Sequence, residues 1–126
     1  MQKIELKETI TTPYLLLDAD NGMIKVEGRS IPENVIDFYQ PILNWIDSYL
    51  KEPKDKTEVH FKLEYFNTSS SKRLFDIMKK VENIASLENK TAVINWYYEE
   101  DDDTIKNLGE DFQALLEVPI NLVIIT

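Results

Sequence analysis

Cysteine is absent from this 126-residue sequence, and histidine occurs once, at His60. The lack of thiols excludes a disulfide framework, a thiol nucleophile and a cysteine zinc site. A single imidazole excludes the paired histidines of a zinc-binding helix. Glycine is scarce, with three residues, and the sequence has no glycine-rich phosphate loop and no G-x-S-x-G nucleophile motif. The common signatures of metal, nucleotide and hydrolytic chemistry are therefore missing.

Long apolar runs are missing as well. No run approaches the length of about 18 residues that crosses a bilayer. The first residues have no apolar stretch typical of a secretory signal, so we expect a cytoplasmic protein with no membrane association. The length fits one domain over residues 1–126. The 43% of hydrophobic and 29% of charged residues are typical of a globular domain with its own core.

Negative charge is in excess and is unevenly placed. The chain has 14 basic and 23 acidic residues, a net charge of −9. Residues 99–126 contain eight acids and one base, which leaves only −2 for the rest of the chain. An acidic protein of this kind repels nucleic acid and anionic membranes, and it attracts basic partners.

The first elements predicted are strands. Residues 14–18 and 23–27 flank a turn that contains Asn21-Gly22, a strong signal for a β-hairpin. The Asp18-to-Gly22 segment resembles a calcium loop, but its glycine comes one position early and Arg29 replaces the bidentate glutamate. We interpret it as a turn. Residues 3–8 alternate weakly and are expected to add an edge strand.

The first helix is predicted after this hairpin. Ser30 and Glu33 have capping-box spacing, so Ser30 is the expected N-cap. Apolar residues then recur at helical spacing: Val35, Phe38, Ile42, Trp45, Ile46 and Tyr49. Pro41 removes one helical hydrogen bond, and we expect a kink there.

The rest of the chain alternates strands with helices. Residues 57–66 predict a strand with Val59, Phe61, Leu63 and Tyr65 on one side and His60, Lys62, Glu64 and Phe66 on the other. A helix over 69–87 would bury Leu74, Ile77, Met78, Val81, Ile84 and Ala85. A strand at 92–98 precedes a helix capped by Asp102 or Asp103, with Ile105, Leu108, Phe112 and Leu115 on one face. A strand at 120–125 follows Pro119.

This order predicts the fold class. It is an α/β single domain, with a mixed β-sheet, an N-terminal hairpin and three α-helices mainly on one face. The later strand–helix–strand units favour parallel pairing through right-handed crossovers.

One segment concentrates hydroxyl side chains where a strand meets a helix. This hydroxyl segment, residues 66–73, contains Asn67, Thr68, Ser69, Ser70, Ser71, Lys72 and Arg73. Thr68 or Ser69 would cap the helix, and capping needs one hydroxyl. The other interpretation is a phosphorylation site, because a phosphate is favoured beside the positive end of a helix and near two basic side chains.

Other candidate residues have simpler interpretations. His60 is expected at the surface, because no nucleophile or orienting group is evident for it. Trp96-Tyr97-Tyr98 predict core packing on one side of a strand and cross-strand contacts on the other. The acidic run Glu99-Glu100-Asp101-Asp102-Asp103 is interpreted as a solvated loop at a helix N-terminus, because adjacent carboxylates diverge instead of surrounding a cation.

Three stretches resemble the SiaC family of bacterial regulatory phosphoproteins: Ser30-Ile31-Pro32-Glu33-Asn34, Tyr65 through Lys72, and Asn95-Trp96-Tyr97-Tyr98. Their order and spacing fit the family over nearly the whole chain. The chain departs from the family pattern in a third serine, Ser71, in Tyr97 at a position of histidine, and in its heavier acidic run.

The resemblance implies a fold similar to anti-sigma-factor antagonists (STAS-like) and a switch with no catalytic residue, cofactor or metal. A kinase would phosphorylate Thr68, and a PP2C-type phosphatase would remove the phosphate. The unphosphorylated form would bind and activate a diguanylate cyclase, which makes cyclic di-GMP. Asn67, Ser69, Ser70, Ser71, Lys72 and Arg73 would form the loop that faces the kinase or partner.

Two rival hypotheses stay open at this point. A constitutive binding module would hold a basic partner through its exposed sheet face and acidic C-terminal region, without phosphorylation. A small hydrolase would use His60 and a carboxylate, although no substrate is indicated.

Overall fold

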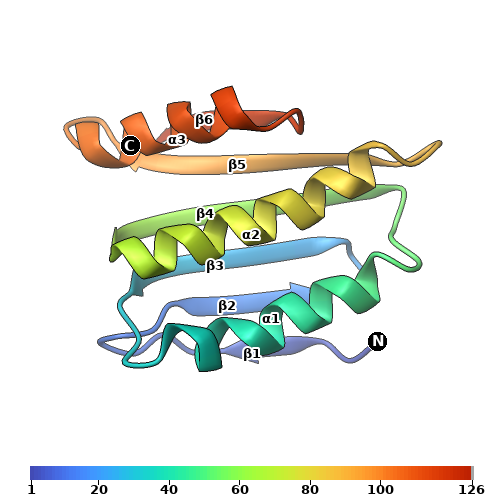
Figure 1. The fold of residues 1–126 in the computed structure, drawn as a ribbon, viewed down its shortest axis with the longest axis horizontal. Helices are drawn as coiled ribbons and strands as arrows, with labels where there is room; N and C mark the ends of the chain where they lie inside the picture. Colours follow the sequence, from blue (N-terminus) through green and yellow to red (C-terminus); the bar gives the residue numbers. More distant parts are fainter. Residues whose placement is uncertain (126) are drawn as a thin grey trace.

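The computed structural model describes residues 1–125, and all nine predicted elements are present (Figure 1). In chain order they are β1 (Ile4–Leu6), β2 (Tyr14–Asp18), β3 (Met23–Ser30), α1 (Val35–Tyr49), β4 (Lys56–Phe66), α2 (Thr68–Ala85), β5 (Thr91–Glu99), α3 (Asp103–Leu115) and β6 (Ile120–Ile125).

The six strands form one mixed sheet in chain order, from β1 at one edge to β6 at the other. The first three strands pair antiparallel, and β3 to β6 pair parallel. Each parallel connection carries one helix, as a crossover between parallel strands requires. The predicted mixed sheet is confirmed, and its parallel part aligns the carboxyl ends of four strands along one side of the molecule.

The hairpin between β2 and β3 is a tight turn. The Asp18 carboxylate accepts hydrogen bonds from the backbone and side-chain amides of Asn21, at 3.3 and 2.8 Å. The bond from the side-chain amide is the main reason that the pKa of Asp18 lies below its usual range. Gly22 has a positive φ of 60°, and a side chain there would collide with the Lys56 carbonyl oxygen. The interpretation of this segment as a turn is confirmed.

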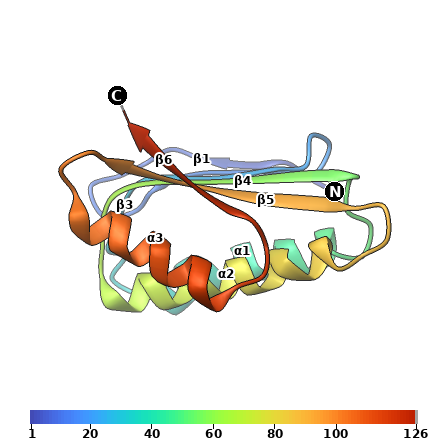
Figure 2. The same ribbon diagram turned by 90° about the horizontal axis from the view of Figure 1, so that it is seen from above.

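All three helices cover the same face of the sheet (Figure 2). Alternate residues of the inner strands point to this side and are fully buried. They include Leu15, Leu17, Ile24, Val26, Val59, Phe61, Ile94 and Trp96. The intervening residues lie on the opposite face, which no helix covers among residues 1–125.

The expected start of the first helix was wrong. Asn34 is the N-cap of α1, and its side chain accepts a hydrogen bond from the Asp37 amide at 3.1 Å. Ser30 instead ends β3, where it pairs with Phe66 and is fully buried. The capping-box spacing gave a wrong N-cap because β3 continues through Ser30. The α1 helix runs through Pro41, and the kink stays a prediction.

Two predicted core positions were also wrong. Ala85 is exposed, because α2 ends there and its last buried residue is Ile84. Leu115 is 66% exposed at the end of α3. The next residue, Leu116, adopts an extended conformation and turns into the core instead. Within residues 1–125, no helix is long and apolar enough to cross a membrane.

Candidate functional site

The hydroxyl segment lies where β4 passes into α2, at the carboxyl ends of the parallel strands (Figure 1). Asn67 is the N-cap of α2: its side-chain oxygen accepts from the Ser70 amide at 2.9 Å, and its carbonyl accepts from the Ser71 amide at 3.0 Å. The expectation that Thr68 or Ser69 caps the helix was wrong, because the helix begins one residue earlier and asparagine is itself a strong N-cap. The hydroxyls of Thr68 and Ser69 are therefore not needed for capping.

The four hydroxyl side chains have different environments. Thr68 and Ser69 are exposed, Ser70 is fully buried, and Ser71 is half-buried. The Ser71 hydroxyl donates to the Thr68 carbonyl at 2.9 Å within the helix. Thr68 and Ser69 are thus the hydroxyls most accessible to another protein, and we call them the exposed pair.

Ser70 belongs to a buried hydroxyl network with Ser30 and Tyr39. Ser30 Oγ donates to Ser70 Oγ at 3.0 Å and shares a hydrogen bond of 2.5 Å with the Tyr39 hydroxyl. Burial raises the pKa of Tyr39, so its hydroxyl stays protonated as a donor. The network joins the end of β3 to Tyr39 of α1 and to Ser70 in the first turn of α2, the turn that also carries the exposed pair. Sequence reasoning missed it, because residues 40 positions apart meet only in the folded sheet.

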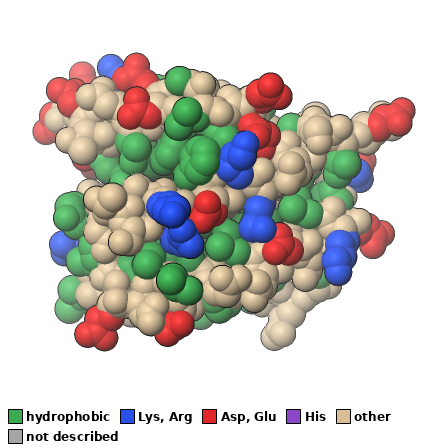
Figure 3. All heavy atoms as spheres, in the orientation of Figure 1, with side chains coloured by type: hydrophobic (Ala, Val, Ile, Leu, Met, Phe, Trp, Pro, Cys, Tyr) green, Lys and Arg blue, Asp and Glu red, His purple; other side chains and the backbone are tan. Residues whose placement is uncertain are grey.

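The exposed pair lies in the first turn of α2, and two basic residues follow it along the helix. Among the described residues, the amides of Thr68 and Ser69 make no hydrogen bond, as expected for the first turn of a helix. Lys72 is exposed and lies one turn beyond Thr68, on the same side of α2. Arg73 is half-buried and pairs with Asp76 at 3.3 Å. Figure 3 shows Lys and Arg side chains over α2, whereas acidic side chains gather where β5 passes into α3.

A register shift in β4 changes which side chains border the junction. Gly28 pairs with Leu63 and Arg29 with Tyr65, which leaves Glu64 as an extra residue in β4. Tyr65 is consequently 53% exposed. Phe66 turns inward and packs edge-to-face on Trp96 with ring centroids 6.1 Å apart. The predicted placement of these two aromatic residues was wrong, because a bulge reverses the alternation of a strand beyond it.

The aromatic run in β5 divides between the two faces of the sheet, as predicted. Trp96 and Tyr98 are buried, and Trp96 Nε1 donates to the Ile105 carbonyl at 2.8 Å. Tyr97 lies on the face without helices, where its hydroxyl is 2.8 Å from His60 Nδ1. Partial burial lowers the pKa of His60, so the ring is neutral near pH 7. His60 thus has a structural partner in Tyr97.

The acidic run ends at the N-terminus of α3. The Asp102 carboxylate accepts from the Ile105 amide at 3.0 Å, which confirms Asp102 as the N-cap. Most of the run is exposed. In the part of the chain that the structure describes, no three His, Asp or Glu side chains converge as ligands for a metal ion.

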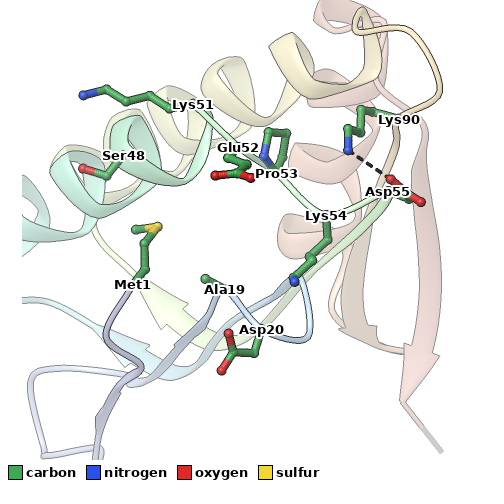
Figure 4. Close-up of a pocket in the computed structure, with 10 residues that line it drawn as sticks. All are labelled: Met1, Ala19, Asp20, Ser48, Lys51, Glu52, Pro53, Lys54, Asp55 and Lys90. Carbon is green, nitrogen blue, oxygen red and sulfur yellow. Dashed lines mark hydrogen bonds and ion pairs between the residues drawn. The ribbon is translucent and has the colours of Figure 1, made fainter.

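A hollow of about 730 Å³ lies at the opposite end of the strands (Figure 4). It is lined by Met1, Ala19, Asp20, Ser48, Lys51, Glu52, Pro53, Lys54, Asp55 and Lys90. Its side chains carry both signs of charge, and Lys90 already pairs with Asp55 at 3.0 Å. None of the residues predicted for the functional site lies in this hollow. The predicted residues are instead brought together at the start of α2.

The fold and the β4–α2 junction define a class of protein. It is a small α/β domain that carries accessible hydroxyls at the N-terminus of the helix that follows a central strand. A model of the SiaC family, described as SiaC family regulatory phosphoprotein, matches residues 6–125. The chain belongs to the SiaC family. The resemblance carried by the three sequence stretches is thereby confirmed.

Related proteins cover almost the full chain. An uncharacterized protein of Pseudomonas aeruginosa strain UCBPP-PA14 is 26% identical over 119 residues, or 94% of each chain. The crystal structure of apo-SiaC from Pseudomonas aeruginosa is 25% identical, with a TM-score of 0.86 over 98% of this chain and 99% of that one. A SiaC structure solved in complex with the diguanylate cyclase SiaD, described as activated by SiaC, has 24% identity and a TM-score of 0.89 over 97% and 99% of the chains.

Proposed function

We propose that this protein is a non-enzymatic phospho-switch, in which phosphorylation of Thr68 controls binding to an output protein. The output protein is a diguanylate cyclase, which the unphosphorylated form binds and activates in cyclic di-GMP signalling. A protein kinase adds the phosphate, and a PP2C-type phosphatase removes it. Asn67, Ser69, Ser70, Ser71, Lys72 and Arg73 shape the surface around Thr68 that the kinase and the output protein meet.

The observation that carries the proposal is the position of Thr68 as the first residue of α2. Its side chain is exposed, and Asn67 already caps the helix. Neighbouring amides and Lys72 are available to a phosphate, which adds about −1.5 to −2 charges. Negative charge is favoured at a helix N-terminus. We therefore expect the fold to tolerate the phosphate without rearrangement.

The same charge would disfavour a bound partner. A protein docked over the start of α2 would have to desolvate a phosphate that water and the helix end already stabilise. Binding would be lost through local charge and bulk, with no refolding of the domain. Switching would thus require only a surface change at Thr68.

The choice of output protein rests on the relatives. The SiaC of Pseudomonas aeruginosa, whose fold this chain shares, is described as the activator of the diguanylate cyclase SiaD. The likeness to anti-sigma-factor antagonists is part of the proposal and rests on the fold alone, a mixed sheet with helices packed against it.

A pull-down from lysate of the native host tests the proposal. The baits are the wild type, Thr68→Asp and Ser69→Asp, and the retained proteins are identified by mass spectrometry. We expect a diguanylate cyclase on wild type and its loss from Thr68→Asp. Ser69→Asp is the matched control, because it adds the same charge one residue away on an equally exposed side chain. It should retain more of the cyclase than Thr68→Asp does.

Identical partners on all three baits would contradict control by Thr68. They would favour a constitutive module that binds through charge, especially if raising the salt concentration released the partner. Circular dichroism checks that each bait is folded, because loss of binding supports the switch only where the fold is intact.

A further inference from the structure

The two edges of the sheet are protected to different degrees. At one edge, β1 has three residues and lies within a charged segment that includes Lys3, Glu5 and Lys7. At the other edge, β6 has six residues, none of them charged or proline. It pairs with β5 in continuous register over Ile94 to Glu99. A regular apolar strand of this kind is a ready template for an additional strand.

The backbone of β6 has hydrogen-bonding groups directed away from the sheet. Pro119 accepts from the Ile94 amide at 2.9 Å, so odd-numbered residues direct their amides and carbonyls toward β5. The even-numbered residues therefore direct theirs outward. Gln113 covers the first of them, because its side-chain amide donates to the Ile120 carbonyl at 2.7 Å. Among residues 1–125, Leu122 and Ile124 are left as the hydrogen-bonding positions of the open edge.

Apolar side chains flank these open positions on both faces. Ile124 is 46% exposed on the helix side. Val123 and Ile125 are half-buried on the opposite face. Cross-strand contacts with such residues stabilise sheet pairing. An added strand would gain contacts from side chains as well as hydrogen bonds from the backbone.

An acidic hollow at the end of β6 indicates what kind of segment fits this edge. It has a volume of about 520 Å³ and lies beside Ile125, at the carboxyl ends of β3 to β6. Its acidic lining residues are Glu8, Glu27, Glu64, Glu99 and Asp102, against one base, Lys62. A second copy of this chain would bring another C-terminal region of net charge −7 to the same place, which electrostatic repulsion disfavours.

We propose that the open edge of β6 accepts an extended basic segment of a partner protein as a seventh strand. Leu122 and Ile124 would form the backbone hydrogen bonds, and a lysine or arginine of the added segment would enter the acidic hollow beside Ile125. This mode of recognition is β-strand addition. The proposal does not rest on phosphorylation, because Thr68 lies on a different element.

The test uses a fluorescent heptapeptide of alternating lysine and valine as the probe, with an alternating glutamate and valine peptide as its matched control. We expect saturable binding of the lysine peptide, measured by fluorescence anisotropy, and weaker binding as salt is raised. The glutamate peptide should not bind. In hydrogen exchange, the amides of Leu122 and Ile124 should be slowed by the lysine peptide. The Val123 amide, which faces β5, should be protected already.

A pair of variants at one position isolates the backbone contribution. Ile124→Pro removes an outward amide and no bond to β5, so we expect binding to weaken about tenfold. Ile124→Thr keeps the amide and should stay within about threefold of wild type. Thr68→Asp should bind the peptide like wild type, which separates failure of this proposal from failure of the phospho-switch.

Three outcomes would overturn the proposal. They are absence of saturable lysine-peptide binding, protection of amides elsewhere than β6, and undiminished binding by Ile124→Pro. Dimers in sedimentation that Ile124→Pro dissolves would instead show that a second copy occupies the edge, against the choice of a basic partner.

Discussion

Thr68 and Ser70 lie in the same turn of α2, yet the environments of their hydroxyls are opposite. The Thr68 side chain is exposed, whereas Ser70 is fully buried and bonded to Ser30. Thr68 is accessible to an enzyme that would add a phosphate, whereas the Ser70 hydroxyl links the helix to the sheet through Ser30. Residue type alone therefore does not identify a modification site, because each hydroxyl must also be free of a structural role.

The largest difference is expected from placing a carboxylate at each position. Ser70→Asp would bury a charge beside Ser30 and should lower the free energy of unfolding by about 3–5 kcal/mol. Thr68→Asp should change it by less than about 1 kcal/mol, in the stabilising direction, because acidic side chains are favoured at a helix N-terminus. Urea denaturation of both variants measures this contrast. Equal losses would contradict the assigned environments.

The buried network can be weakened from the α1 side. Tyr39→Phe removes the hydroxyl bonded to Ser30, and we expect a loss of about 1–2 kcal/mol in the free energy of unfolding. Tyr14→Phe is the control, because that hydroxyl bonds to Glu5 at the surface. It should cost less than Tyr39→Phe in the same denaturant titration.

The same tyrosine predicts a dependence on pH. Burial raises the pKa of Tyr39, so its neutral form is favoured in the folded state. The stability that this preference adds to the folded state is fully present below about pH 10, the pKa of an unperturbed tyrosine. It is lost as the pH rises through the higher folded-state pKa. Between these limits wild type should lose stability more steeply than Tyr39→Phe. Parallel curves in alkaline denaturation would show that Tyr39 does not contribute.

Loss of the N-cap of α2 is expected to have a smaller effect on the free energy of unfolding. Asn67→Ala removes the acceptor for the Ser70 amide and should cost about 1 kcal/mol in thermal or urea unfolding. Ser69→Ala tests the rejected alternative and should cost less than about 0.5 kcal/mol. A larger loss of stability from Ser69→Ala would indicate that the Ser69 hydroxyl caps the helix.

The smallest effect concerns Lys72. In the unphosphorylated protein Lys72→Gln should leave the free energy of unfolding unchanged within about 0.3 kcal/mol. After phosphorylation of Thr68 the same variant should lose about 0.3–0.5 kcal/mol relative to wild type, because residues four apart on a helix face one another. Comparing the two states of each protein isolates the contact between lysine and phosphate. No difference between the states would exclude that contact.

The sequence predicts the elements of this fold well, because their signals are local. Asn21-Gly22 marks the hairpin, and helical periodicity marks α2 over Leu74 to Ile84. The first signal reflects the positive φ of a tight turn, and the second reflects burial against one sheet face. A single segment can reveal either of them on its own.

Two of the errors, at Tyr65 and Ser30, occur where distant segments decide local structure. Tyr65 is exposed because β4 gains a residue opposite Gly28 and Arg29 of β3. Ser30 continues a strand because Phe66 pairs with it. Neither pairing can be read from the segment that contains the residue, and both lie beside the candidate site. The sequence therefore singles out the segment of the candidate site, whereas its N-cap, Asn67, and its buried hydroxyl network were not predicted.

Mapping the phosphate on protein purified from its native host tests the central claim most directly. Intact-mass measurement, followed by fragmentation of the peptide that contains residues 66–73, locates the modified hydroxyl. We predict one phosphate, on Thr68, that PP2C-type phosphatase treatment removes as cyclase binding returns. A phosphate on Ser70, or an unmodified segment in protein that already fails to bind the cyclase, would contradict the account.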